Sequence, residues 1–321
     1  MQYKCQVLVE VRVNVYFNHD GGGDDFVALL LLLQMQDVQL TGVSVIAADG
    51  YLEPSFDASR KIIDRFGKTA VEVAKSDSRG KNPFPKEWRL HSFYVDAFPI
   101  LNESGKMDAP VSELPAHHHL IEKVRATAGK TTMLLTGPLT DLARALDEAP
   151  DIEEKIDRVV WMGGTFLPQG NVMEPEHDGT AEWNAFWDPE AVARVWKSSL
   201  RIDMVALEST NQVPLTLDVR NAWAKQRKYD AIDFVGQCYA LVPPLIFFET
   251  NSTYYLWDVL TAAYIGKPDL VKVKTVNSVV YTDGVRQGRT QESPEGRPVN
   301  LIYDVDRDAF FDYITELMKQ A

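Results

Sequence analysis

The sequence is poor in cysteine and comparatively poor in basic residues. Only two cysteines, Cys5 and Cys238, occur among 321 residues. Two cysteines cannot build a disulfide framework or a cysteine-based zinc site, so a reducing, cytoplasmic setting is expected. Lys and Arg number 33 against 46 Asp and Glu, which gives a net charge of −13. Because non-specific nucleic-acid binding needs basic surface, this balance predicts a small-molecule partner and no nucleic acid.

Long hydrophobic runs and internal repeats are also missing. The longest apolar run, Phe26–Leu33, is too short to cross a bilayer, so no membrane association is expected. No apolar block follows a charged start, so no signal peptide is expected either. We find no linker, no low-complexity stretch and no repeat at solenoid spacing. With 45% hydrophobic residues, the chain is predicted to form a single domain over residues 1–321.

Short apolar runs alternate with helical patterns, which is typical of βαβ units. The fold class predicted is α/β, an open and mostly parallel sheet flanked by helices. The expected strands are Val13–Phe17, Leu40–Ile46, Val71–Ala74, Thr132–Leu135, Val159–Met162 and Ile202–Ala206. The expected helices include Asp25–Gln34, Asp57–Phe66, Leu120–Thr127, Pro138–Ala149, Pro189–Lys197 and Tyr255–Ile265. Alternation of apolar and polar residues over Val7–Phe17 favours a strand with one wet face.

Polar or small residues follow most of the predicted strands. In chain order these are Asp20, Asp49, Thr136, Gly163 with Gly164, and Glu208 with Asn211. Open α/β sheets bind ligands beyond the carboxyl ends of their strands. We therefore expect these positions to converge there, although they lie far apart in the sequence.

The most informative segment is Asn18–Asp25, which places three aspartates and three glycines between a strand and a buried helix. Glycine-rich turns before helices usually bind phosphate, but this one has no Lys, Ser or Thr and its side chains are anionic. Clustered carboxylates instead suit a hard cation such as Ca²⁺. The alternative is a solvated acidic turn, in which Asp24 and Asp25 favour the helix N-terminus. That alternative leaves Asp20 and the glycines unexplained.

This segment resembles the Asp-rich motif of the nucleoside N-ribohydrolases, Ca²⁺-dependent enzymes that split ribonucleosides into base and ribose. The resemblance continues, in the right order, from about Val13 to the C-terminus, and it is closest to the purine-preferring branch. The further segments that carry it are Asn82–Arg89, Thr136–Thr140, Met162–Gly164, Gly170–Val172, Asp178–Asn184, Tyr254–Asp258 and Leu260–Tyr264. It implies a Rossmann-like fold, a cytoplasmic enzyme of purine salvage, and a homodimer or homotetramer.

The resemblance also implies a role for eleven residues. Asp20 would be the general base and a metal ligand, with Asp25, Asp258 and the main-chain carbonyl of Thr136 completing the Ca²⁺ site. Ribose would be bound by Asp24, Asn171, Glu182 and Asn184. Glu182 and Asn184 would share one face if their segment is extended. Trp88 and Trp257 would stack on the base, and Asp49 would touch the departing base.

Each of these residues has a simpler interpretation. Asp258 could be a helix N-terminal acid, Thr136 a cap before Pro138, and Asp49 a loop acid. Residues 167–180 could be a polar surface loop, and tryptophans often belong to the core. His19 is predicted to be structural. In His117–His119, consecutive residues on a helix point in different directions, which favours a solvated helix start over a metal site.

The sequence departs from the family pattern at two positions and in one segment. Asn18 stands where the family commonly has Asp, which removes a negative charge near the cation. Glu249 stands where a basic residue is expected. No His occurs between Pro243 and Tyr255, where the pyrimidine-accepting branch has its proton donor. The leading hypothesis is therefore a Ca²⁺-dependent purine ribonucleoside hydrolase. The rival is a non-catalytic Ca²⁺-dependent ribose- or nucleoside-binding protein of the same fold.

Overall fold

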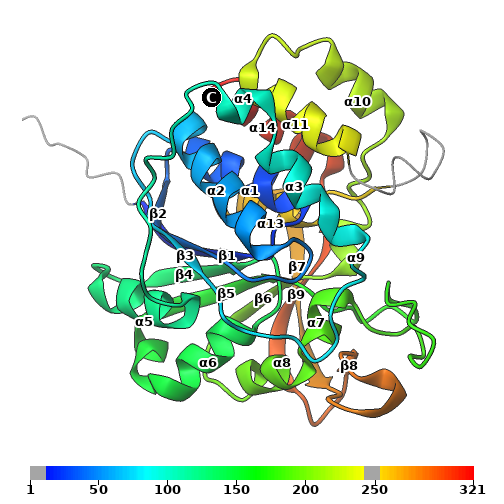
Figure 1. Cartoon of the computed structure of the whole chain (residues 1–321). Coiled ribbons are helices and arrows are strands. Elements are labelled where there is room, and N and C mark those ends of the chain that lie inside the picture. The colour runs from blue at the N-terminus through cyan, green and yellow to red at the C-terminus, as the bar shows by residue number, and fades with distance from the viewer. Residues whose placement is uncertain (1–11, 242–253) are drawn as a thin grey trace, which may run out of the picture.

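The structure, a computed structural model, describes residues 12–241 and 254–321, and these form one nine-stranded sheet with helices on both faces (Figure 1). The sheet order is β3-β2-β1-β4-β5-β6-β9-β7-β8. Pairing is parallel from β3 through to β9 and antiparallel between β9, β7 and β8. The predicted α/β class with a mostly parallel sheet is confirmed. Cys5, the segment Val7–Val11 and Glu249, together with the rest of 243–253, lie outside the described residues.

All six predicted strands are present, with ends shifted by a few residues. The strands are β1 Val13–His19, β2 Val38–Val45, β3 Val73–Lys75, β4 Thr131–Leu135, β5 Ile156–Met162, β6 Ile202–Val205, β7 Val271–Val280, β8 Thr290–Glu292 and β9 Arg297–Val305. The last three were not predicted. The prediction that the first strand has a wet face is wrong within the described part, because β1 lies between β2 and β4 and Val15, Tyr16 and Phe17 are all fully buried.

Two helical layers cover the two faces of the sheet. One layer contains α1 Gly23–Gln34, α2 Leu52–Phe66, α3 His91–Asp96, α4 Pro99–Asn102, α11 Asp230–Leu241, α13 Trp257–Gly266 and α14 Arg307–Met318, with α10 Leu217–Ala224 beyond it. The other contains α5 Ala116–Ala126, α6 Thr140–Glu148 and α8 Pro189–Trp196. The short helices α7 Trp183–Trp187 and α9 Leu207–Thr210 follow β5 and β6. No helix among the described residues is both long and apolar enough to span a membrane.

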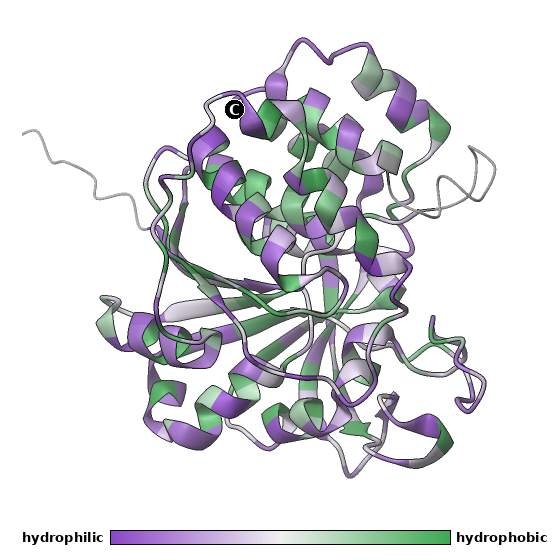
Figure 2. Cartoon of the chain, in the orientation of Figure 1, coloured by the Kyte–Doolittle hydropathy of each residue, from purple (hydrophilic) through white to green (hydrophobic). Residues whose placement is uncertain are grey.

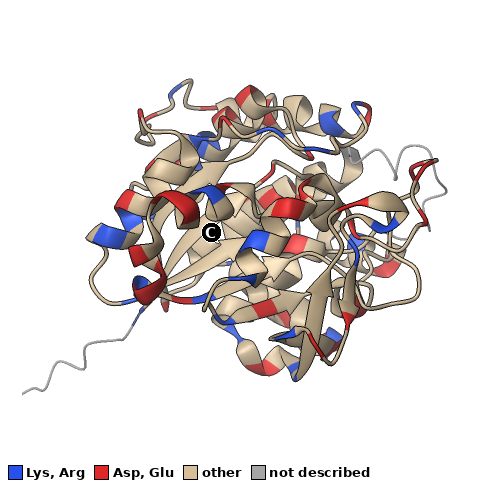
Figure 3. Cartoon of the chain, turned by 90° about the horizontal axis from the view of Figure 1, so that it is seen from below, with Lys and Arg blue, Asp and Glu red and all other residues tan. Residues whose placement is uncertain are grey.

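Helix α1 is the centre of the first layer. Its run Phe26–Leu32 is buried throughout, because α2, α11, α13 and α14 pack around it above the sheet. Hydrophobic residues follow the central strands in Figure 2, and charged residues of both signs are interspersed over the outer helices in Figure 3. An all-apolar helix with an acidic first turn is thus fixed in the core. Its N-terminal aspartates are held with it.

The prediction that α5 begins as a solvated helix end is wrong. His117 and His119 are almost fully buried, and only His118 is exposed. The Nδ1 atom of His119 lies 2.8 Å from the hydroxyl of Tyr16. This helix packs against β2 and α6, so the first turn faces protein on two sides.

Candidate active site

A cavity of about 250 Å³ lies at the carboxyl edge of the parallel strands. This edge is the place where the residues that follow the predicted strands were expected to converge. Of the eleven predicted site residues, all except Asp25 line it. They are Asp20, Asp24, Asp49, Trp88, Thr136, Asn171, Glu182, Asn184, Trp257 and Asp258.

The turn between β1 and α1 needs glycine because neighbouring atoms leave no room for a larger side chain. Gly21 has a φ of +83°, and a Cβ there would lie 2.1 Å from the hydroxyl of Ser55. The Asp25 carboxylate accepts hydrogen bonds from the Gly22 amide at 2.6 Å and from the Thr136 hydroxyl at 2.5 Å. Asp25 therefore caps its own helix and lies behind the cavity wall, next to Asp20.

Asp20 is held from three directions. The Asp49 amide donates to its carboxylate at 3.3 Å, and the Gly50 amide donates to its main-chain carbonyl at 2.7 Å. Gly137 packs against its side chain so closely that a Cβ at 137 would lie 2.7 Å from the Asp20 Cβ. The position of the carboxylate is fixed by backbone on both sides.

Asp20, Asp24, Asp25 and Asp258 are buried and Asp49 is partly buried, and none of the five forms an ion pair with a basic side chain of the described residues. Burial, then the charge of Asp25, raises the pKa of Asp20 well above its usual value and that of Asp24 to about 7. Burial and the neighbouring aspartates likewise raise the pKa of Asp258. Such a cluster holds its charge only if positive charge is added.

Asp24 connects α1 to the start of α13. Its carboxylate accepts from the Asp258 amide at 3.2 Å and from the Tyr254 hydroxyl at 3.2 Å. The Asp258 amide is one of the helix-terminal donors that need a partner outside the helix. Residues from the two ends of the chain are thereby joined at the cavity.

Asn18 does not line the cavity, and its side chain bonds to polar residues behind it. Its amide donates to Ser44 at 2.8 Å and to the buried Asp141 at 3.2 Å. Asp141 also accepts from Ser76 and Ser78. An Asp at position 18 would face the Asp141 carboxylate, so the amide avoids a repulsion between two buried acids.

The polar wall opposite the aspartates comes from α7 and the segment before it. Glu182 is the N-cap of α7 and accepts from the amides of Gly164 and Asn184, both at 2.8 Å. Asn184 donates to the carbonyls of Thr136 and Met162 at 3.0 and 3.1 Å. The segment is not extended beyond Glu182, because this capping starts a helix. Both side chains still reach the cavity, and burial raises the pKa of Glu182 to about 7.

Aromatic residues form the remaining walls. Trp183 stacks on Phe84 at 4.9 Å and meets the half-exposed Trp88 edge-on at 5.3 Å between ring centres. On the other side, Trp257 packs edge-on against Tyr254 at 4.7 Å. The indole N–H groups of Trp183 and Trp257 have no hydrogen-bond partner among the described residues.

Sequence reasoning missed Phe84, Trp183, Tyr254 and His91 as cavity residues. The first three stand inside or beside matched motifs, so proximity to Trp88, Asn184 and Asp258 could have identified them. His91 has no such signal. Its ring nitrogens face the carbonyls of Trp88 at 2.5 Å and Gly21 at 2.9 Å.

Four of the strand-end residues expected to converge do not line the cavity, namely Gly163, Gly164, Glu208 and Asn211. Glu208 accepts from the Phe166 amide at 2.7 Å and supports the segment after β5. Asn211 is exposed at the end of α9. The turn after β6 folds directly into α9, which directs both away. His19 is buried and lies 3.0 Å from the Ser59 hydroxyl, which fits a structural role.

The chain matches the family model described as inosine-uridine preferring nucleoside hydrolase over residues 15–312. A solved structure of an inosine-uridine preferring nucleoside hydrolase from Bacillus anthracis is 68% identical, with a TM-score of 0.92 and coverage of 96% of this chain and 100% of that chain. A probable uridine nucleosidase 2 from Oryza sativa subsp. japonica is 28% identical over 96% of this chain and 93% of its own length. A pyrimidine-specific ribonucleoside hydrolase from Shewanella woodyi is 26% identical over 94% and 96%.

The matched residues include most of β1, all of β2 to β9 and every residue that lines the cavity. The chain therefore belongs to the inosine-uridine preferring nucleoside hydrolase family, and it is a hydrolase acting on the N-glycosidic bond of ribonucleosides.

Proposed function

We propose that this hydrolase prefers purine ribonucleosides and uses one Ca²⁺ bound by Asp20, Asp25, Asp258 and the main-chain carbonyl of Thr136. The observation that carries the proposal is a single cavity in which a buried carboxylate cluster faces an aromatic wall. A nucleoside has a matching division, because its ribose carries polar hydroxyls and its base is planar, with π faces that stack on aromatic rings.

The donor set fits a hard divalent cation. Its members are carboxylate and carbonyl oxygens, which Ca²⁺ prefers, and the raised pKa values of Asp20 and Asp258 come from burial without a counter-charge. The Thr136 carbonyl already accepts from Asn184 but keeps a second lone pair. When bound, the cation supplies positive charge that lowers the pKa of a coordinated water.

The protein's own residues would transfer the proton of the water and bind the ribose. Asp20, fixed by the Asp49 and Gly50 amides, accepts the proton of the attacking water as general base. Asp24, Asn171, Glu182 and Asn184 line the same cavity and bind the ribose hydroxyls. Glu182 is oriented before substrate arrives, because three main-chain amides already donate to its carboxylate.

The base is placed between aromatic faces. Trp88 and Trp257 line the cavity, and Trp183 with Phe84 extends the same surface. Stacking area grows with ring size, so a purine gains more from these walls than a pyrimidine does. The relatives described above include enzymes named for uridine or pyrimidines, which makes base preference the part to be measured first.

The first test replaces the proposed general base. Asp20→Asn should lower turnover on the order of 10²–10⁴-fold, because the water loses its proton acceptor. Asp218→Asn, an exposed acid outside the cavity, is the control and should retain full activity. Release of ribose from inosine is the measurement, and a fully active Asp20→Asn enzyme would remove Asp20 from the mechanism.

A second test moves Asp20 without changing its chemistry. In Gly137→Ala, the added methyl would meet the Asp20 side chain at 2.7 Å and displace the carboxylate. A displacement of about 1 Å should cost on the order of 10²-fold in turnover. Gly236→Ala is the matched control, since a Cβ there meets nothing within 4 Å. If Gly137→Ala turns over as fast as the control, the fixed position of Asp20 is irrelevant to catalysis.

The third test concerns the base. We expect inosine, guanosine and adenosine to be cleaved faster than uridine, and chelation of divalent cations to stop all cleavage. Trp257→Ala should weaken purine processing by roughly 1–3 kcal/mol, and Trp257→Phe should restore most of it. Equal rates for uridine and inosine would overturn the purine preference. Ribose binding without cleavage of any nucleoside would instead favour the non-catalytic alternative.

A further inference from the structure

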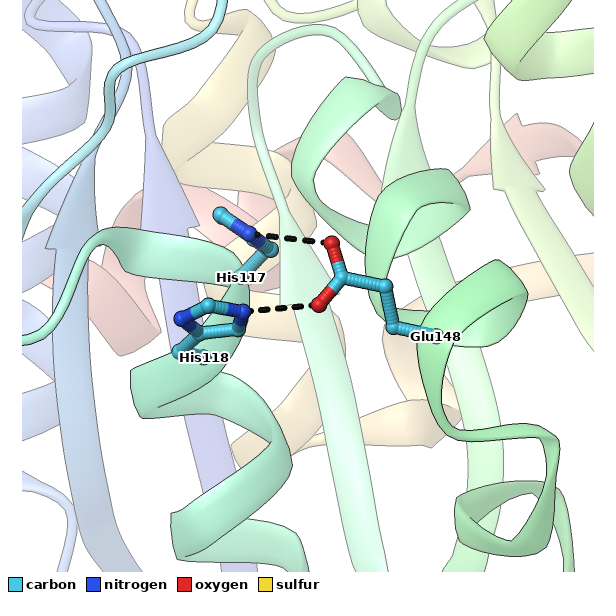
Figure 4. A group of neighbouring side chains, drawn as sticks. All are labelled: His117, His118 and Glu148. Atoms are coloured by element: carbon cyan, nitrogen blue, oxygen red, sulfur yellow. Dashed lines mark hydrogen bonds and ion pairs between the residues drawn. The ribbon is translucent and has the colours of Figure 1, made fainter.

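A second group of metal-ligating side chains lies on the opposite helical layer. His117 and His118 begin α5, and Glu148 ends α6 (Figure 4). The Nε2 atom of His117 is 3.3 Å from one oxygen of Glu148, and the Nε2 atom of His118 is 2.7 Å from the other. The three donor atoms lie within 4.8 Å of one another. None of these residues lines the cavity of the active site.

Helix packing brings the side chains of His117 and His118 together, although consecutive residues on a helix were expected to point in different directions. The imidazole rings of His117 and His118 have centres 4.1 Å apart, because α6 lies against the first turn of α5. Both histidines stand at the positive end of the helix, where an imidazolium is disfavoured. A neutral imidazole nitrogen is the form that binds metals.

The hydrogen bonding of His117 is unsatisfied within the described residues. Its Nδ1 atom has no hydrogen-bond partner, and the nearest acid oxygen, on Asp77, is 3.9 Å away. Its Nε2 atom faces a donor, Arg144 at 3.2 Å, and an acceptor, Glu148 at 3.3 Å. One nitrogen cannot accept from the first and donate to the second at once. A cation at this nitrogen would satisfy both Nε2 and the carboxylate.

We propose that His117, His118 and Glu148 form a binding site for a transition metal of the Zn²⁺ class, with water completing the coordination. Two imidazole nitrogens and one carboxylate are a common zinc donor set. Tetrahedral ligands at about 2.0–2.1 Å from zinc are about 3.3–3.4 Å apart, close to the 3.3 Å between His117 and Glu148. Hard oxygen-seeking Ca²⁺ would not select this site.

The surroundings allow a cation to enter. His118 and Glu148 are 46% and 47% exposed, so ions reach them from solvent. Arg144 is the nearest positive charge, and its Nη1 atom pairs with Asp77 and bonds to Ser78. Only the contact from its Nη2 atom to His117 has to be given up. Glu148 and Asp77, which contact these histidines, carry two negative charges against the single positive charge of Arg144.

The test uses the full chain without an affinity tag, stripped by chelator and then saturated with Ca²⁺ to occupy the active site. Titration with ZnCl₂ in a calorimeter should show one saturable equivalent per chain. His118→Ala and Glu148→Gln should each lose that equivalent. Asp218→Asn changes an exposed acid on α10, outside this group, and should bind as the unmodified protein does.

Crystals soaked in ZnCl₂ provide a readout that does not depend on variants. Anomalous scattering at the zinc edge should give a peak within about 2.0–2.2 Å of all three donor atoms. The proposal is overturned if the unmodified protein takes up no zinc, if both variants bind as much zinc as it does, or if no anomalous peak lies between these residues. These results are independent of the proposed purine preference and of Asp20.

Discussion

The structure depends on burying several aspartates together at one edge of the sheet. Asp20, Asp24, Asp25 and Asp258 are almost fully removed from solvent, and like charges in such a place repel each other strongly. The fold confines them there with α1, whose apolar body fixes the acidic turn, and with α13, whose first turn bonds to Asp24. The amides that donate to Asp25 and Asp20 reduce the free-energy cost of burying these carboxylates. No basic side chain of the described residues forms an ion pair with these acids. The proposed cation would supply the counter-charge that the protein itself does not provide.

The same constraint explains why much of the site could be predicted from sequence. Strand-end residues such as Asp20, Asp49 and Thr136 had to meet, because parallel strands end at one edge. The motif resemblance then identified Asn171, Glu182 and Asn184, which no periodicity indicates. Asp25 was placed in the same cluster, but only the structure shows that its carboxylate is turned back to cap Gly22. Capping is decided by local geometry, which depends on the conformation of the glycine turn.

What escaped prediction depends on contacts between distant segments. Trp183 and Phe84 are nearly 100 positions apart and form one wall only when α7 folds against the 82–89 segment. The sheet is extended by β7, which pairs antiparallel with β9, and by β8, which pairs antiparallel with β7; no local signal for either strand was found. The histidines of α5 were expected in solvent because the spacing of residues within one helix does not show that α6 packs against it. In each case the deciding term is tertiary packing, which overrides local pattern.

The central claim, that the buried aspartates require a cation, is tested most directly by thermal unfolding of the chelator-treated protein with increasing Ca²⁺. At about 100 times its dissociation constant, a ligand that binds only the folded state stabilises it by about 2.7 kcal/mol. The account predicts a rise in Tm of at least a few degrees for the unmodified protein and a much smaller rise for Asp258→Asn. An unchanged Tm at saturating Ca²⁺, with the protein folded throughout, would contradict it.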